Sequence, residues 1–258
     1  MSSKLAKQYH SVTIGDKNTW DDWHLIPTSR PTFGPPEANM MLVEVPGANG
    51  SLNLSKAMTG YVTYKNRSGS FEFLVQTEYW GGSWTKCYHT IMSYLHGEER
   101  HAILDDEPDY YYDCIWNVGS WTNGSKWPTV VLSYSAQPFK KSLHGVSEPW
   151  LWDPFSFETG VINNFQPYDS ETGVLSPITI DGSLTINIIG GDEPVAPTFD
   201  IGTITGSLTV ALNNGTAYAL TANKVNRLYK IKMAGPNNRL VFTGNGVLKG
   251  INYTAGWF

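Results

Sequence analysis

The sequence predicts a mainly β protein of two domains, with one α-helix in the first domain. Short segments in which apolar and polar residues alternate recur along the 258 residues, separated by turn residues. Glycine and proline are plentiful, with 25 and 15 residues, and only 16% of the residues are charged. A period near 3.6 occurs in one place alone, residues 84–95. Together these observations predict a β-rich fold with many turns and a single helix.

The predicted helix has an apolar face with spacings of four, three and four residues, formed by Trp84, Tyr88, Ile91 and Leu95. Ser83 is a suitable N-cap, because its hydroxyl can accept a hydrogen bond from a first-turn N–H. Gly97 stands where a glycine with positive φ would end the helix. A strand at residues 101–104, a turn and a return strand at 110–116 should follow. We interpret this unit as a helix that covers the open end of a β-barrel or sandwich.

The remaining predicted strands of the first domain are residues 9–14, 40–45, 61–64, 71–75 and 130–134. Residues 46–50 have the composition of a tight turn, and residues 56–60 could form one helical turn. The proline-rich segment 27–37 cannot be a central strand, because proline lacks the N–H that a strand ladder needs. We expect this segment to be an extended arm or connector.

A change of composition at residues 138–149 predicts a boundary, with domains at 1–140 and 141–258. Beyond it there is no helical period, and turn residues at 190–191, 213–215, 235–238 and 244–246 separate short strands. Those strands are expected at 178–180, 184–188, 208–212, 229–233, 240–242 and 247–253. Their spacing favours a β-sandwich or jelly roll. The similar heptapeptides 180–186 and 204–210 are too few for a repeat protein, and two similar entries from a turn into a strand explain them.

Charge is distributed unevenly in the second domain. Histidine aside, every charged residue from 142 to 200 is acidic, and every one from 201 to 258 is basic. Two interpretations follow: complementary faces lie on opposite sides of one sandwich, or the acidic face of one copy meets the basic face of the next and closes a ring. The net charge of −5 argues against stable binding to nucleic acid.

No motif for catalysis, for a cofactor or for a metal is present in the sequence. The densest acidic cluster consists of Asp105, Asp106, Glu107, Asp109 and Asp113. Such a cluster raises glycoside hydrolysis and metal binding as alternatives, but its proline and its spacing favour a structural turn. Cys87 and Cys114 should be buried free thiols. Neither a signal peptide nor an apolar membrane span is predicted, so we expect a protein made in a cytoplasm. Because the sequence lacks catalytic motifs, we do not expect an enzyme.

Aromatic residues gather at the predicted entry to the second domain and at the end of the chain: Trp150, Trp152, Phe155, Phe157, Phe165, Trp257 and Phe258. Packing between the domains explains them most simply. A platform on which sugars stack, or a subunit interface, is the functional alternative.

Residues 40–140 resemble the distal tail (Dit) proteins of siphophages and prophages of Gram-positive bacteria. The stretch V-P-G-A-N-G-S-L-N-L at 45–54 is similar to a motif of that family, as are Y-K-N-R at 64–67, F-E-F at 71–73 and the helix ending Y-L-H-G at 94–97. The turn D-D-E-P-D-Y-Y-Y at 105–112 is similar as well. Ala48 and Asn53 stand where the family often has Arg and Asp, so an ion pair at that turn is absent. The structural signature residues are Pro46, Gly47, Gly50, Gly60, Asn66, Arg67, Gly97, Asp106, Pro108, Tyr110 and Tyr111.

The resemblance implies a structural protein of the virion, at the distal end of the phage tail, assembled in the host cytoplasm. The N-terminal domain would be a β-sandwich or split barrel that forms a homohexameric ring, and the C-terminal domain a galectin-like sandwich. The ring would join the major tail tube protein and the tape-measure protein to the tail-associated lysin, the baseplate or receptor-binding proteins, and DNA would pass through its lumen. We expect segment 27–37 to reach a neighbouring subunit or baseplate partner. The main alternative is a carbohydrate-binding, lectin-like second domain that attaches the tail to cell-wall saccharide.

Overall fold

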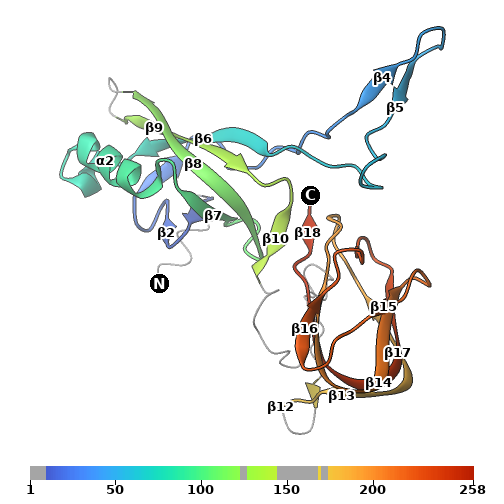
Figure 1. Cartoon of the computed structure of the whole chain (residues 1–258). Coiled ribbons are helices and arrows are strands. Elements are labelled where there is room, and N and C mark those ends of the chain that lie inside the picture. Colours follow the sequence, from blue (N-terminus) through green and yellow to red (C-terminus); the bar gives the residue numbers. More distant parts are fainter. Residues whose placement is uncertain (1–9, 123–126, 144–167, 170–173) are drawn as a thin grey trace. The chain divides into compact units, whose positions relative to one another are not determined.

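The computed structural model describes residues 10–122, 127–143, 168–169 and 174–258. Contacts divide the chain into two compact units, residues 1–140 with Phe258 and residues 141–257, and each unit has its own apolar core. Strands dominate both units, and one α-helix, α2 (Trp84–Leu95), is found among the described residues (Figure 1). The predicted mainly β fold with one helix is therefore confirmed.

The first unit is built on one antiparallel sheet with the strand order β2-β1-β7-β8-β9-β6-β3. In β9 every second residue is buried, as expected for a strand that turns one face to a core. The two ends of this path are β2 and β3, so these strands form an open sheet rather than a closed barrel. The strands are β1 (Val12–Ile14), β2 (Lys17–Asn18), β3 (Leu25–Pro27), β6 (Arg67–Val75), β7 (Glu99–Leu104), β8 (Tyr110–Thr122) and β9 (Thr129–Ala136).

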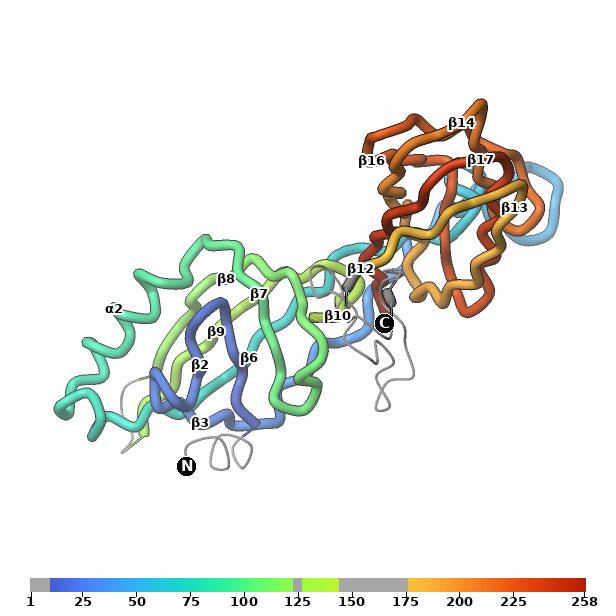
Figure 2. Tube along the Cα trace, turned by 90° about the horizontal axis from the view of Figure 1, so that it is seen from below, coloured from blue at the N-terminus to red at the C-terminus, as the bar shows by residue number. Residues whose placement is uncertain are grey.

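Helix α2 covers this sheet and follows a short 3-10 helix, η2 (Thr77–Trp80). The Ser83 hydroxyl accepts a hydrogen bond from the Lys86 N–H at 3.4 Å, as predicted for the N-cap. Gly97 has φ +80° directly after the last residue of the helix cap, also as predicted. The residues that α2 buries in the core shared with the sheet are Cys87, Ile91 and Leu95. Figure 2 shows the helix running beside the strands of the first unit.

Two strands of the first unit stand apart from the sheet. β4 (Leu42–Glu44) and β5 (Ser51–Asn53) form a separate two-stranded hairpin. The expected strand at 61–64 is reduced to a single bridge between Ala38 and Tyr64, and residues 56–60 form a single turn closed by the hydrogen bond from the Gly60 N–H to the Lys56 carbonyl oxygen.

The second unit contains one curled antiparallel sheet with the order β13-β17-β14-β15, and β16 also pairs with β14. β13 joins the two strands expected at 178–180 and 184–188, and β17 joins those expected at 240–242 and 247–253. The expected strand at 229–233 is wrong: of these residues only Met233 pairs, in a bridge to Val195. The strands are β13 (Ile178–Ile188), β14 (Thr198–Leu212), β15 (Tyr218–Ala219), β16 (Lys224–Arg227) and β17 (Asn238–Asn252).

The three long strands of this sheet are curled (Figure 1), and each contains a glycine with positive φ. Gly182 and Gly206, from the two similar heptapeptides, both have φ +79° inside continuous strands. Gly244 of β17 is paired with Gly182, and a Cβ on it would lie 1.9 Å from the Ser207 carbonyl oxygen. Only glycine permits this approach of two backbones. The glycine-rich stretch 244–246 is therefore a bend within a strand, and its prediction as a turn was wrong.

The remaining elements are short. β10 (Lys140–Ser142) and β18 (Gly256–Trp257) lie at the two places where the chain passes between the units, and β11 (Tyr168–Asp169) pairs with β12 (Val174–Leu175). The aromatic residues predicted to matter at 150–165 lie outside the described residues. Of the terminal aromatics, Trp257 packs against the core of the second unit.

Candidate functional site

The most distinctive surface is a hairpin arm, residues 39–64, which contains β4 and β5. Ala38 and Tyr64 form an antiparallel bridge at its root. Next to this bridge the Lys65 N–H donates to the Glu37 carbonyl oxygen at 2.8 Å, and their side chains form an ion pair with an Nζ–Oε2 distance of 3.1 Å. Among the described strands β4 and β5 pair only with each other, so both outer edges of the hairpin are open.

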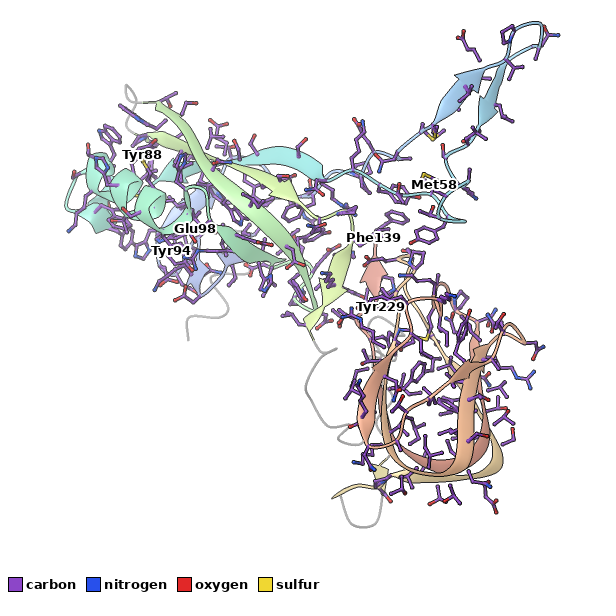
Figure 3. The ribbon with its side chains drawn as sticks, viewed as in Figure 1. Met58, Tyr88, Tyr94, Glu98, Phe139 and Tyr229 are labelled. Atoms are coloured by element: carbon purple, nitrogen blue, oxygen red, sulfur yellow. The ribbon has the colours of Figure 1, made fainter. Side chains whose placement is uncertain are left out.

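The arm presents apolar side chains to solvent. Every residue from 40 to 53 is exposed, and between 39 and 64 only Glu44 and Lys56 are charged. Met58 is 94% exposed and projects from the arm in Figure 3. The arm carries seven of the sixteen exposed large apolar residues of the described chain: Met40, Met41, Leu42, Val43, Val45, Leu52 and Met58. None of them belongs to either core.

This combination is unusual for a surface that stays in water. Large contiguous apolar surface is rare on monomers and marks interaction sites, and an isolated two-stranded hairpin is only marginally stable. Open strand edges add unpaired N–H and C=O groups that another chain can pair with. The arm therefore has the chemistry of one half of a protein–protein interface.

Four of the predicted signature residues lie in the arm. Pro46, Gly47 and Gly50 form the tip of the β4–β5 hairpin, where the two glycines have φ +82° and +79°. Gly60, with φ +80°, donates its N–H to the Lys56 carbonyl oxygen at 2.8 Å. Residues with side chains rarely adopt such φ values, so these glycines set the path of the arm.

Arg67, another signature residue, lies on β6 directly after the arm and binds Gly34, which precedes the arm, and Pro138. It is only 5% exposed, its Nε donates to the Pro138 carbonyl oxygen at 2.8 Å and its Nη1 to the Gly34 carbonyl oxygen at 2.9 Å. Burial lowers the pKa of Arg67, and its Nη2 has no hydrogen-bond partner among the described residues. The neighbouring Asn66 donates from Nδ2 to the Ser135 hydroxyl at 3.4 Å.

The proline-rich segment 27–37 packs on the first unit at Phe33, and its expected contact with a neighbouring subunit or baseplate partner stays a prediction. The Phe33 ring stacks on that of Tyr112 with centroids 3.9 Å apart and meets the Phe71 ring edge-on at 5.3 Å. This contact and the bond from Arg67 to Gly34 hold part of the segment on the core, and seven exposed large apolar residues lie in the hairpin arm that follows.

The acidic turn between β7 and β8 also serves to hold neighbouring segments. The Asp105 carboxylate accepts hydrogen bonds from the Ser11 N–H and hydroxyl at 3.0 and 2.6 Å. Asp106, a signature residue, pairs with His10 at 3.0 Å and with Arg30 at 2.8 Å. Burial would raise the pKa of Asp106, but the hydrogen bonds from Arg30 and His10 outweigh it and lower that pKa.

Two further residues of the acidic cluster and three further signature residues also make contacts within the first unit. Glu107 pairs with Lys140 at 3.0 Å, and Asp113 pairs with His101 at 2.6 Å. Tyr110, which follows Pro108 in the turn, lies under Lys140 with Nζ 4.8 Å from its ring, and Tyr111 packs on His101 at 4.7 Å. Gly97 donates its N–H to the Trp116 carbonyl oxygen at 2.8 Å. These contacts give the acidic turn a structural role.

The cysteines are buried free thiols, as predicted. Burial raises the pKa of Cys87 to about 12 and raises that of Cys114 as well, so both stay protonated at neutral pH. Within the described part of the chain no three His, Cys, Asp or Glu side chains are placed to share a metal ion. No described helix combines the length and hydrophobicity that crossing a bilayer requires.

Comparisons with known proteins identify the fold. No family model and no curated protein matches the sequence. The structure is similar to the crystal structure of the SPP1 Dit (gp 19.1) protein, which is described as a paradigm of the hub adsorption apparatus in phages that infect Gram-positive bacteria. The match covers 96% of this chain and 99% of that chain, with a TM-score of 0.53 and 12% sequence identity. The chain therefore has a Dit-like fold.

Proposed function

We propose that this chain is a structural protein of a phage tail, located at the tail tip or baseplate of the virion, with no catalytic activity. Two independent observations support the proposal. The Dit-like fold extends over nearly the full length of both chains. The sequence motifs at 45–54, 64–67 and 105–112 are similar to those of the Dit family in the same order.

The hairpin arm is the observation that carries the assembly part of the proposal. Each copy offers one exposed apolar arm, and the arm of one copy covers a different surface on the next. Such a head-to-tail contact closes into a ring when its rotation permits. Fully burying one large apolar side chain contributes about 1.5–3 kcal/mol, so several per copy can offset the entropy lost on association.

By resemblance, the ring contains six copies and joins the major tail tube protein and the tape-measure protein to the lysin, baseplate or receptor-binding proteins. Residues 1–140 would be the ring-forming domain, because the arm belongs to the first unit. Residues 141–258 would be the galectin-like domain. A lumen lined by a chain of net charge −5 would repel DNA phosphates and let the genome pass without binding.

The test is the oligomeric state of the full chain and of a Leu52→Asp variant, measured by light scattering after size exclusion and by negative-stain microscopy. We expect six-fold annuli for the wild type and single protomers for the variant, because a carboxylate at a buried apolar contact is costly to desolvate. Val225→Asp is the matched control. Leu52 and Val225 are both 54% exposed, but Val225 lies on β16 of the second unit, and this variant should still form rings.

Wild-type protein that remains a protomer at high concentration would contradict the proposal. If the Leu52→Asp variant forms rings as well as the wild type does, ring assembly would be supported, but the hairpin arm would not be part of the ring contact. Dissociation by both variants would show that the substitution acts through general instability rather than through the arm.

A further inference from the structure

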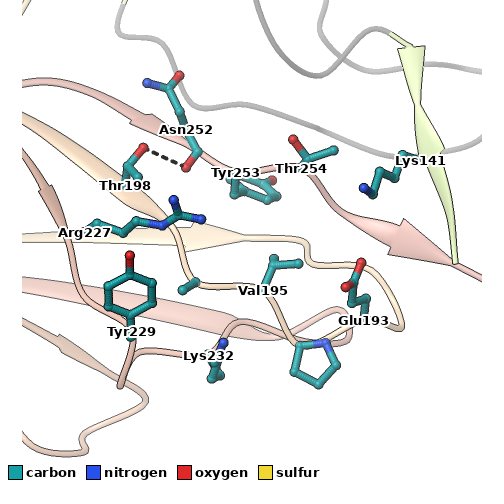
Figure 4. A pocket seen from close by; sticks show the side chains of 12 residues that line it. Lys141, Glu193, Val195, Thr198, Arg227, Tyr229, Lys232, Asn252, Tyr253 and Thr254 are labelled. Atoms are coloured by element: carbon teal, nitrogen blue, oxygen red, sulfur yellow. Dashed lines mark hydrogen bonds between the residues drawn. The ribbon is translucent and has the colours of Figure 1, made fainter. Parts of the chain in front are cut away.

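The second unit contains a pocket of about 480 Å³ at the end of β16 and β17, within the range of volumes of small-ligand sites. Figure 4 shows Arg227 and Tyr229 along one wall, Lys232 below them and Glu193 at the other end. All of these residues belong to the second unit. No residue of the hairpin arm, which belongs to the first unit, lines the pocket.

The pocket has a rigid base. The backbones of Val195 and Met233 exchange two hydrogen bonds, at 2.9 and 2.8 Å, which join the two segments that line it. Tyr253 is 5% exposed and its hydroxyl donates to the Ile189 carbonyl oxygen at 3.0 Å. A ligand would therefore meet a surface that is already formed.

Three cations line the pocket, Lys141, Arg227 and Lys232, and the last two have buried neighbours. Lys232 stands between Ile231 and Met233, which are 2% and 0% exposed, so its backbone is fixed in the core. Arg227 follows Asn226, whose amide side chain makes three hydrogen bonds with the backbone of Thr221 and Lys224 at 2.8–2.9 Å. The backbone at Lys232 and Arg227 is therefore anchored, while both side chains are exposed.

Neither Arg227 nor Lys232 is neutralised by a partner among the described residues. Six ion pairs are found within the first unit. None of them involves the six basic residues of 201–258, which are Lys224, Arg227, Lys230, Lys232, Arg239 and Lys249. A planar guanidinium without a carboxylate is suited to bind an oxyanion through two parallel hydrogen bonds.

Tyr229 adds a second kind of recognition. It is 67% exposed, and the Arg227 guanidinium lies 5.3 Å from the centre of its ring. An exposed aromatic face beside a cation can stack on the apolar face of a sugar ring while the cation binds its acidic group. The Thr198 hydroxyl, which donates to the Asn252 carbonyl oxygen at 3.3 Å, still has its oxygen available to accept from a sugar hydroxyl.

We propose that this pocket binds an acidic saccharide, with the carboxylate or phosphate group on Arg227 and Lys232 and the sugar ring against Tyr229. Neutral sugars would lack the charged contact and free anions would lack the stacking surface. Because the pocket is open on one side, we expect a dissociation constant of about 0.1–1 mM for a single saccharide unit.

The test is isothermal titration calorimetry of the full chain with four probes. Trigalacturonate supplies a carboxylate, and glucose 6-phosphate supplies a phosphate. Fully methyl-esterified trigalacturonate is the neutral control, and inorganic phosphate is the anion without a sugar. Binding of either acidic sugar, at least about tenfold tighter than both controls, is the expected result, and the preferred probe identifies the acidic group.

The variants distinguish this pocket from general attraction to a basic surface. Arg227→Gln should weaken binding at least about tenfold and Tyr229→Ala about fivefold, whereas Lys230→Gln should change it less than about twofold. Lys230 is the matched control, because it carries the same charge next to Tyr229 but does not line the pocket.

Three results would overturn the proposal: no binding of either acidic sugar at 10 mM, equal binding of the neutral ester, or equal loss in the Arg227 and Lys230 variants. Inorganic phosphate that binds as tightly as the acidic sugars, with no effect of Tyr229→Ala, would also overturn it, since the pocket would then recognise charge alone. None of these results bears on the ring, which the oligomeric state tests.

Discussion

The sheet of the first unit and the hairpin arm are both built from antiparallel strands with apolar residues, but these residues are buried in the sheet and exposed in the arm. On β6 the inward residues Phe71, Phe73 and Val75 are 5%, 0% and 4% exposed. On the arm Leu42 and Leu52 are 55% and 54% exposed. The difference lies in what stands opposite each strand: β6 has two neighbouring strands and a core, while the arm has neither.

This comparison shows that an apolar strand indicates that a surface must be covered, but not whether the same chain or another chain covers it. In the sheet the covering layer comes from the same chain, so the apolar residues stabilise the protomer. In the arm no described part of the chain supplies that layer. Its apolar residues should therefore contribute little to folding and much to association.

The largest expected effect tests this division directly. Phe73→Ala should lower the free energy of unfolding of the first unit by about 3–5 kcal/mol, because it leaves a cavity in a close-packed core. Leu52→Ala should change it by about 0.5 kcal/mol or less. Urea denaturation followed by tryptophan fluorescence, at a dilution where light scattering finds only protomers, measures both. A similar loss for both variants would mean that the arm packs within its own protomer.

A smaller effect is expected at the root of the arm, where a buried and an exposed cation stand two residues apart. Arg67→Met should cost about 2–3 kcal/mol, because the Gly34 and Pro138 carbonyl oxygens lose charged donors. Lys65→Met should cost about 0.5 kcal/mol or less, since its side chain and that of Glu37 are 60% and 79% exposed.

The same denaturation experiment compares these two variants, and limited proteolysis adds a local measurement. Arg67→Met should speed cleavage within residues 28–37, because the bond to Gly34 helps to hold that segment on the core. If Lys65→Met speeds cleavage there equally, the segment is held from the root of the arm instead of from the core.

Local patterns predicted the parts of the fold that local chemistry determines. The helix, its cap at Ser83 and the glycine at 97 follow from periodicity and from hydrogen bonds within a few residues. The hairpin from β7 to β8 follows from turn residues between two alternating strands. In each case the sequence signal and the physical cause involve the same few residues, so the prediction needs no knowledge of the rest of the chain.

The errors occur where distant strands decide the outcome. The stretch 244–246 has the composition of a turn, yet Gly244 is required by the approach of the Ser207 backbone from another strand. The strand expected at 40–45 forms at Leu42–Glu44, but its apolar residues are exposed, because no described part of the chain covers them. The pocket of the second unit escaped prediction because Thr198, Arg227 and Asn252 come from three strands that only the folded sheet brings together.

The smallest expected effect concerns pH and the contacts that keep the proline-rich segment on the sheet. The pKa of Asp106 is lowered from 3.8, because hydrogen bonds from Arg30 and His10 outweigh the effect of burial. A lowered pKa in the folded state means that the ionised carboxylate stabilises the fold above about pH 4, and that this stabilisation is lost as the pH falls through the folded-state value. Asp106→Asn should therefore cost about 0.5–1 kcal/mol at pH 5, and the difference from the wild type should shrink towards pH 3. Denaturation midpoints at both pH values measure this, with Glu37→Gln in the exposed pair at the root as the control. If the difference in stability between the wild type and Asp106→Asn stays constant down to pH 3, Asp106 acts through its shape and not through its charge. The proline-rich segment would then not be held by charge, and its contrast with the open hairpin arm would be lost.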